Sequence, residues 1–169
     1  MATPVITIVG YSNSGKTTVA TELIRILDEM GYKIAAVKHC PHGHDIDREG
    51  SDTQRMALAG ASAVVAVSPD KLTRIEWTDT DSSLQRIAAT LNGFNLVIAE
   101  GFKDSAAPKV VIRKGGCAVS FNEGVFAIVT DEIESDSRTL EDADETHGPS
   151  RFKFNEMYKL ATYIRDSFL

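Results

Sequence analysis

Hydrophobic positions along the chain follow two spacings, and their order predicts an alternation of strands and helices. Short apolar runs predict strands at residues 5–9, 33–38, 63–67, 72–77, 94–99, 109–113 and 125–130. Apolar residues three or four positions apart predict helices at 16–30, 52–59, 82–91 and 154–168, and Gly31 is expected to end the first of them. The acidic, hydrophobic-poor stretch 131–148 predicts an exposed loop. This order favours an α/β fold with a doubly wound, mainly parallel sheet and helices on both faces.

The segment between the first strand and the first helix carries the most specific motif. Residues 10–17 read G-Y-S-N-S-G-K-T and fit the phosphate-binding pattern G-x-x-x-x-G-K-[ST], so a P-loop NTPase fold is expected. Glycines permit a tight turn whose N–H groups hold anionic oxygens, and the helix start adds partial positive charge. Lys16 is expected on the β- and γ-phosphates, as a catalytic residue, and Thr17 on Mg²⁺. The predicted nucleotide contacts are Gly10, Ser12, Asn13, Ser14, Gly15, Lys16, Thr17 and Thr18.

Composition is that of an ordinary globular protein. Of the 169 residues, 43% are hydrophobic and 25% charged, which suits a single domain over residues 1–169. The net charge of −6 disfavours nucleic-acid and membrane-surface partners. Apolar runs fall short of the roughly 20 residues that cross a bilayer, and the first strand begins too early for a signal peptide, so a cytoplasmic location is expected. Cys40 and Cys117 form no C-x-x-C pair and are expected to be free thiols.

The run 95–101 is apolar and ends in Glu100 and Gly101, which is typical of a Walker B strand. Ligands of open α/β sheets bind outside the carboxyl ends of the strands, so Glu100 is expected beside the P-loop. Its carboxylate is predicted to hold Mg²⁺, directly or through water, or to polarise an attacking water.

Three of the four histidines fall within six residues, in the polar segment 38–47. One interpretation places His39, His42 and Asp45 near nucleotide or substrate phosphates, with Asp45 or Asp47 near Mg²⁺. A transition-metal site is a second interpretation, although the spacing matches no closed zinc pattern. A plain polar loop is the third.

Other charged residues are weaker candidates. Arg55 and Lys103 are candidate phosphate contacts, and for each a solvated surface charge is an equal alternative. Asp131 follows the strand 125–130, where a carboxylate can accept hydrogen bonds from the N1–H and the exocyclic amine of guanine. The four-residue N-K-x-D pattern of guanine binders is absent, so the residues alone leave the base open.

These motifs follow one another in a specific order. The P-loop is followed by segment 38–47, which contains Lys38, His39, His42 and two spaced aspartates. The next segments are G-S-D-T-Q-R at 50–55, A-G-A at 59–61, E-G-F-K at 100–103 and P-K at 108–109. The set resembles the molybdopterin-guanine dinucleotide biosynthesis protein B (MobB) family over residues 5–113. Ser51 stands where that family usually has lysine, and Thr53 stands where it usually has serine.

The resemblance implies a GTP-binding protein with weak, Mg²⁺-dependent GTPase activity. It also implies an adapter role for the MobA-like nucleotidyltransferase that joins GMP to molybdopterin, with molybdopterin as a bound substrate. A homodimer is implied, and molybdoenzyme maturation factors are further expected partners. Lys16 and Thr17 carry over as phosphate and Mg²⁺ contacts, and Glu100 carries over as the Walker B acid.

A different function on the same fold is an ATP-dependent small-molecule kinase or a dethiobiotin synthetase-like ligase. Such an enzyme would prefer ATP and turn over rapidly with an acceptor, whereas an adapter would bind nucleotide and partner with turnover near background. The motifs contain no arginine finger, a group worth roughly 10³–10⁵ in phosphoryl-transfer rate, and no water-positioning glutamine. Slow hydrolysis is therefore expected, which favours the adapter.

Overall fold

The computed structural model describes residues 3–44, 47–78, 82–115, 123–131 and 148–169. The chain divides into two compact units, one made of residues 1–39 and 83–169 and the other of residues 40–82. The single domain expected over residues 1–169 stays a prediction.

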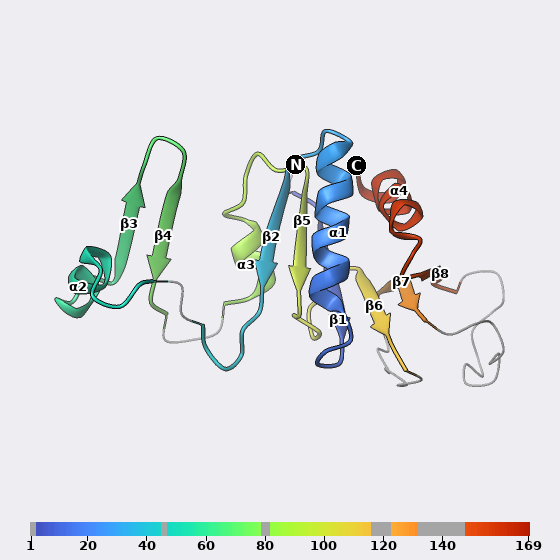
Figure 1. The fold of residues 1–169 in the computed structure, drawn as a ribbon, viewed down its shortest axis with the longest axis horizontal. Coiled ribbons are helices and arrows are strands. Elements are labelled where there is room, and N and C mark those ends of the chain that lie inside the picture. Colours follow the sequence, from blue (N-terminus) through green and yellow to red (C-terminus); the bar gives the residue numbers. More distant parts are fainter. Residues whose placement is uncertain (1–2, 45–46, 79–81, 116–122, 132–147) are drawn as a thin grey trace. The chain divides into compact units, whose positions relative to one another are not determined.

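Among the described residues, the first unit contains a six-stranded sheet with the order β2-β5-β1-β6-β7-β8 (Figure 1). All neighbouring strands in it are parallel, as predicted, and β1 lies between β5 and β6. The carboxyl ends of these strands therefore share one edge of the sheet. The strands are β1 (Val5–Gly10), β2 (Ile34–Lys38), β5 (Leu96–Glu100), β6 (Lys109–Arg113), β7 (Val125–Thr130) and β8 (Ser150–Lys153).

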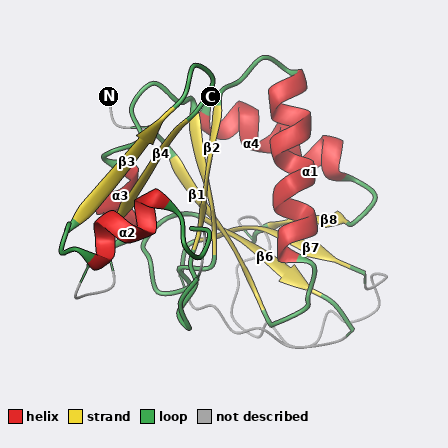
Figure 2. Ribbon diagram, turned by 60° about the vertical axis from the view of Figure 1, so that its left-hand side comes forward, coloured by secondary structure: helices red, strands yellow, loops and turns green. Residues whose placement is uncertain are grey.

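Helices cover both faces of this sheet, as the alternating pattern predicts. The helices α1 (Lys16–Glu29) and α4 (Met157–Phe168) pack against each other, and α3 (Leu84–Ala88) lies across the sheet from α1 (Figures 1 and 2). Alternate strand residues face two separate apolar clusters. The larger cluster joins the strands to buried residues of α1 and α4, among them Leu23, Leu27, Leu160 and Ile164. The smaller cluster contains Val9, Val111 and Ile128.

The second unit pairs a short helix with a hairpin. The helix α2 (Asp52–Leu58) begins after Ser51, whose hydroxyl accepts a hydrogen bond from the Gln54 N–H at 3.0 Å. The strands β3 (Ala63–Val67) and β4 (Leu72–Glu76) are antiparallel. As predicted, residues 68–71 form the turn between them. Within this unit, α2 contacts β3.

The sequence-based boundaries were wrong at the last helix and at α3. Residues 150–153 form the unpredicted strand β8, and α4 begins at Met157 rather than at residue 154. Lys153 still pairs with Thr130 of β7, and the chain then turns, with the Glu156 N–H donating to the Lys153 carbonyl at 2.9 Å, before α4 begins. The helix predicted at 82–91 is limited to Leu84–Ala88 and is capped by the Ser83 hydroxyl. By contrast, Gly31 ends α1 with φ +90°, as predicted.

Parts of the predicted pattern fall outside the described residues. These are Asp45, Cys117 and residues 132–147 of the loop expected at 131–148. In the described part of the chain, every helix is too short or too polar to cross a bilayer.

Candidate functional site

The loop between β1 and α1 has the backbone that the P-loop pattern requires. Asn13 and Gly15 adopt left-handed conformations with φ +59° and +96°, which asparagine and glycine tolerate better than other residues. A Cβ on Gly10 would lie 2.7 Å from the Ile112 carbonyl oxygen and 2.8 Å from Ser14 Oγ. Only glycine therefore fits at position 10, because β6 lies directly beside it.

Two polar side chains of this loop fit a phosphate ligand. Lys16 Nζ donates to the Tyr11 carbonyl oxygen at 2.5 Å, so the ammonium lies over the loop. Ser14 is 7% exposed, and its buried Oγ has no hydrogen-bond partner among the residues that the structure describes. An unpaired buried hydroxyl costs about 1–3 kcal/mol, which a phosphate oxygen in the loop would offset.

A carboxylate lies beside the start of α1. Thr17 Oγ1 donates to Glu100 Oε2 at 2.8 Å, and Lys38 Nζ is 3.2 Å from Glu100 Oε1. This arrangement follows from strand register, because Glu100 pairs with Ile8 on one side and with Lys38 on the other. Glu100 thus lies where its strand predicts. A hydroxyl and a carboxylate are oxygen donors of the kind that Mg²⁺ prefers, so the two residues fit that ion.

The turn after Glu100 is strained and packs against His39. Gly101 has φ +93°, and Phe102 has φ +51°, which is unusual for an aromatic residue. The rings of His39 and Phe102 are stacked, with centroids 4.7 Å apart, and the His39 N–H donates to the Glu100 carbonyl at 2.9 Å. Strained backbone persists where its surroundings over-determine it. The stack therefore holds the chain directly after Glu100.

Two further predicted residues of the first unit follow strands, Lys103 after β5 and Asp131 after β7. Lys103 is exposed, three residues beyond Glu100. Asp131 follows β7, and its carboxylate oxygens lie 3.1 and 3.3 Å from the Gly115 nitrogen, whose N–H donates to them. Their roles toward phosphate and base stay predictions.

Three other candidates, His42, Asp47 and Arg55, belong to the second unit. Asp47 Oδ1 accepts hydrogen bonds from Ser51 Oγ and Thr53 Oγ1, both at 2.9 Å. The two positions that depart from the family pattern thus hold this carboxylate in place.

Arg55 is 3.4 Å from Asp52, and both side chains are largely exposed. In the described ranges, no three His, Cys, Asp or Glu side chains gather in a way that could hold a metal ion. The second-unit candidates, and Asp45 outside the described residues, stay predictions.

The sequence reasoning missed Phe154 as a neighbour of the P-loop. A Cβ on Gly15 would lie 3.5 Å from Phe154 Cε1, so the aromatic ring lies beside the β1–α1 loop. The available signal was the period-two alternation of Phe152 and Phe154 with polar residues, which is typical of a strand rather than a helix.

Comparison with known proteins gives a consistent set of similarities. Residues 5–131 match the family MobB, described as molybdopterin guanine dinucleotide synthesis protein B. The molybdopterin-guanine dinucleotide biosynthesis adapter protein of Haemophilus influenzae is 32% identical over 144 residues, or 82% of this chain and 81% of that protein. The Escherichia coli K12 protein of the same name is 26% identical over 165 residues, or 92% of this chain and 94% of that protein.

Solved structures show the same fold. A crystal structure of molybdopterin-guanine biosynthesis protein B (mobB) has a TM-score of 0.74 at 30% identity, covering 97% of this chain and 98% of that one. The crystal structure of Bacillus subtilis MobB has a TM-score of 0.68 at 22% identity, covering 98% of both chains.

Gly101→Ala is expected to destabilise the protein more than Gly31→Ala does. Both glycines have φ near +90°, so both substitutions strain the backbone by roughly 1–3 kcal/mol. A new methyl group at position 101 would also lie 2.9 Å from His39 Cβ, whereas within the described chain nothing lies within 4 Å of the one at position 31. Urea unfolding measures the difference, and NMR should show shifted His39 ring signals only in Gly101→Ala. Equal losses with unchanged His39 signals would contradict the role of the stack.

Proposed function

We propose, for a chain that belongs to the family of molybdopterin guanine dinucleotide synthesis protein B, a role in molybdopterin-guanine dinucleotide biosynthesis. In this role the protein is a GTP-binding adapter. Relatives named as adapters of this biosynthesis support the role. The nucleotide part of the proposal rests on one observation above others. The Thr17 hydroxyl lies 2.8 Å from the Glu100 carboxylate, so the P-loop motif and the Walker B-like strand meet at one point.

In this proposal the β1–α1 loop binds the phosphates of GTP. Lys16 would exchange its contact with the Tyr11 carbonyl for the β- and γ-phosphates, where an ammonium neutralises negative charge. The unpaired Ser14 hydroxyl and the start of α1 would add hydrogen bonds to phosphate oxygens.

Thr17 and Glu100 would hold Mg²⁺, which supplies further charge neutralisation on the phosphates. Lys38 Nζ lies 3.2 Å from Glu100 Oε1, so an ion pair also holds this carboxylate in position. Weak GTPase activity belongs to the same proposal. The motifs supply neither an arginine finger nor a water-positioning glutamine, so turnover near background is expected.

The hairpin of the second unit supports the proposed homodimer. Val65, Val67 and Leu72 share one face of it, because Val67 pairs directly with Leu72 and Val65 lies two residues from Val67. Their exposed fractions are 53%, 75% and 67%. A cluster of exposed large apolar side chains is typical of an interaction site. A second copy of the chain would bury this face in a symmetric contact.

The remaining partners and ligands follow from the family alone. They are a MobA-like nucleotidyltransferase, molybdopterin as a bound substrate, and molybdoenzyme maturation factors, in the cytoplasm. His39, His42, Asp45, Arg55 and Lys103 are each a separate candidate for contact with nucleotide or substrate phosphates.

Calorimetric titration tests the nucleotide proposal directly. We expect GTP with Mg²⁺ to bind more tightly than ATP with Mg²⁺, and Lys16→Ala to abolish binding of both, since it removes the phosphate-neutralising ammonium. Lys33→Ala is the matched control, because Lys33 is exposed beside the amino end of β2. Wild-type affinity in Lys16→Ala would overturn the P-loop assignment. A preference for ATP would instead favour a kinase or a ligase.

Glu100→Gln is expected to lower Mg²⁺-dependent GTP hydrolysis with little loss of GTP binding. The amide keeps the size of the side chain and one oxygen, but it loses the negative charge that Mg²⁺ requires. Phosphate release measured with and without Mg²⁺ separates this effect from background. Unchanged Mg²⁺-dependent turnover would remove Glu100 from the mechanism.

The double variant Val67→Asp/Leu72→Asp is expected to convert a dimer into a monomer, since it places two charges on the apolar hairpin face. Lys71→Asp is the control, because it also lowers the net charge by two and lies in the turn beside that face. Light scattering after size exclusion gives the mass, and circular dichroism checks folding. A dimeric double variant would exclude this face, and a monomeric wild type would overturn the homodimer.

A further inference from the structure

A groove of about 450 Å³ runs along α1 from the P-loop end of the helix. It begins at Thr18, the residue after Thr17, and its other side is formed by Phe154 and Asn155 of the turn after β8 and by Tyr158 of α4. This volume lies within the roughly 300–1,000 Å³ typical of ligand pockets. The groove is therefore large enough for a small planar group.

The groove lies next to the proposed phosphate site. The Phe154 ring lies beside the P-loop, since a Cβ on Gly15 would be 3.5 Å from its Cε1. Strand β8 is parallel to the rest of the sheet, so its carboxyl end opens at the same edge as β1 and β5. A nucleotide whose phosphates lie on the loop would extend past Thr18 toward Phe154 and Asn155.

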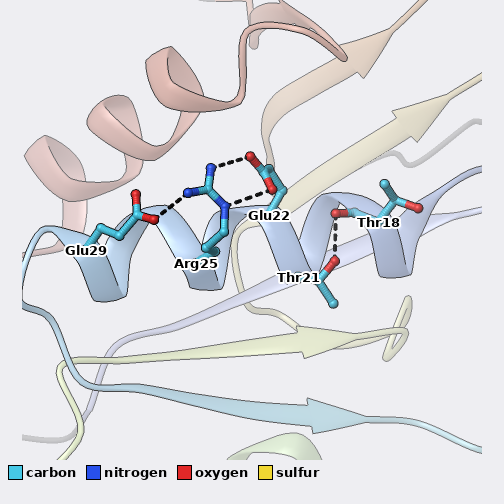
Figure 3. Close-up of polar contacts among 5 residues, drawn as sticks. All are labelled: Thr18, Thr21, Glu22, Arg25 and Glu29. Carbon is cyan, nitrogen blue, oxygen red and sulfur yellow. Dashed lines mark hydrogen bonds and ion pairs between the residues drawn. The ribbon is translucent and has the colours of Figure 1, made fainter.

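The charge of the lining side chains differs along the groove. Along its middle, Arg25 lies between Glu22 and Glu29, with ion pairs of 2.6 and 2.5 Å (Figure 3). The hydrogen bond from Arg25 holds the pKa of Glu22 below its usual range, so this carboxylate stays charged. Two carboxylates and one guanidinium give this part of the groove a net negative charge, which repels phosphate.

The end of the groove near Thr18 is different, because Thr18, Phe154 and Asn155 carry no charge. The neutral end therefore suits the uncharged part of a nucleotide.

The turn that carries Phe154 and Asn155 is held in place by Glu156. The Glu156 carboxylate accepts from the Lys153 N–H at 2.9 Å and from Lys159 Nζ at 2.6 Å. The Phe154 side chain is partly buried against the main core, whereas Asn155 is exposed. An aromatic face and an amide are thus presented together from a fixed turn. An amide can both donate and accept hydrogen bonds, as the edge of a purine requires.

We propose that this end of the groove binds the purine base of the nucleotide, with the Phe154 ring packed against the base and the Asn155 amide hydrogen-bonded to its edge. The proposal rests on the P-loop site described under the proposed function. It adds two base-binding residues to Asp131, which lies at the end of the neighbouring strand β7.

The test compares GTP with inorganic tripolyphosphate, both with Mg²⁺, by calorimetry on the full chain. Wild type should bind GTP more tightly, because only GTP carries a base. Asn155→Ala and Phe154→Leu should each weaken GTP binding by about fivefold to a hundredfold, the range expected for losing one base contact. Tripolyphosphate binding should change less than twofold. Asn155 is exposed, so its variant avoids the packing change that Phe154→Leu introduces.

Matched controls lie at the opposite edge of the sheet. Asn92→Ala and Phe94→Leu alter exposed residues before the amino end of β5 and should leave both affinities unchanged. Variants that bind GTP like wild type, or that lose GTP and tripolyphosphate equally, would overturn the base site and leave the P-loop proposal standing. If wild type binds GTP no better than tripolyphosphate, the base site is also overturned and the P-loop proposal still stands. Failure of wild type to bind either ligand would overturn the proposed function itself.

Discussion

The site depends on the parallel pairing of β1 with β5 on one side and with β6 on the other. In this register Ile8 pairs with Glu100 and Gly10 pairs with Ile112. Ile8 packs in the larger apolar cluster and Val9 in the smaller one, so a slip of one residue would exchange the side chains that pack in the two clusters. Glu100 is therefore held beside the start of α1 by the same packing that stabilises the sheet. The close approach of β6 also leaves room only for glycine at position 10.

Two residues near these strand ends, Ser14 and Phe102, have features that cost free energy when no ligand is bound. Ser14 Oγ is buried and unpaired among the described residues, and Phe102 adopts a left-handed backbone. Burying an unpaired hydroxyl and straining an aromatic residue each cost roughly 1–3 kcal/mol. Both lie next to the residues that would meet phosphate and Mg²⁺. This placement is what a preorganised anion site requires, because its polar groups are aimed before the ligand arrives.

The two units differ in how much of their apolar side-chain surface is buried. The first unit buries its apolar residues between the sheet and the helices, where Leu23, Leu27 and Leu160 are fully covered. The hairpin of the second unit leaves Val67 and Leu72 largely exposed. A two-stranded hairpin has little stability by itself, so an exposed apolar face needs a further contact. In the proposed function, the nucleotide site thus belongs to one unit and the association surface to the other.

The P-loop motif, the alternation of strands and helices and the position of Glu100 could all be predicted from the sequence, because each depends on short contiguous patterns. The sequence also supplied the family, through the order of those patterns. The tertiary structure decided contacts between residues far apart in the chain, such as the Thr17–Glu100 hydrogen bond across 83 positions and the approach of Phe154 to Gly15.

It also decided that residues 150–153 form β8, since a four-residue strand gains its stability from pairing with β7 rather than from its own pattern. The groove along α1 exists only once α4 and the turn before it pack beside that helix. Local patterns follow from the chain's own spacing, whereas a groove depends on which distant elements pack together.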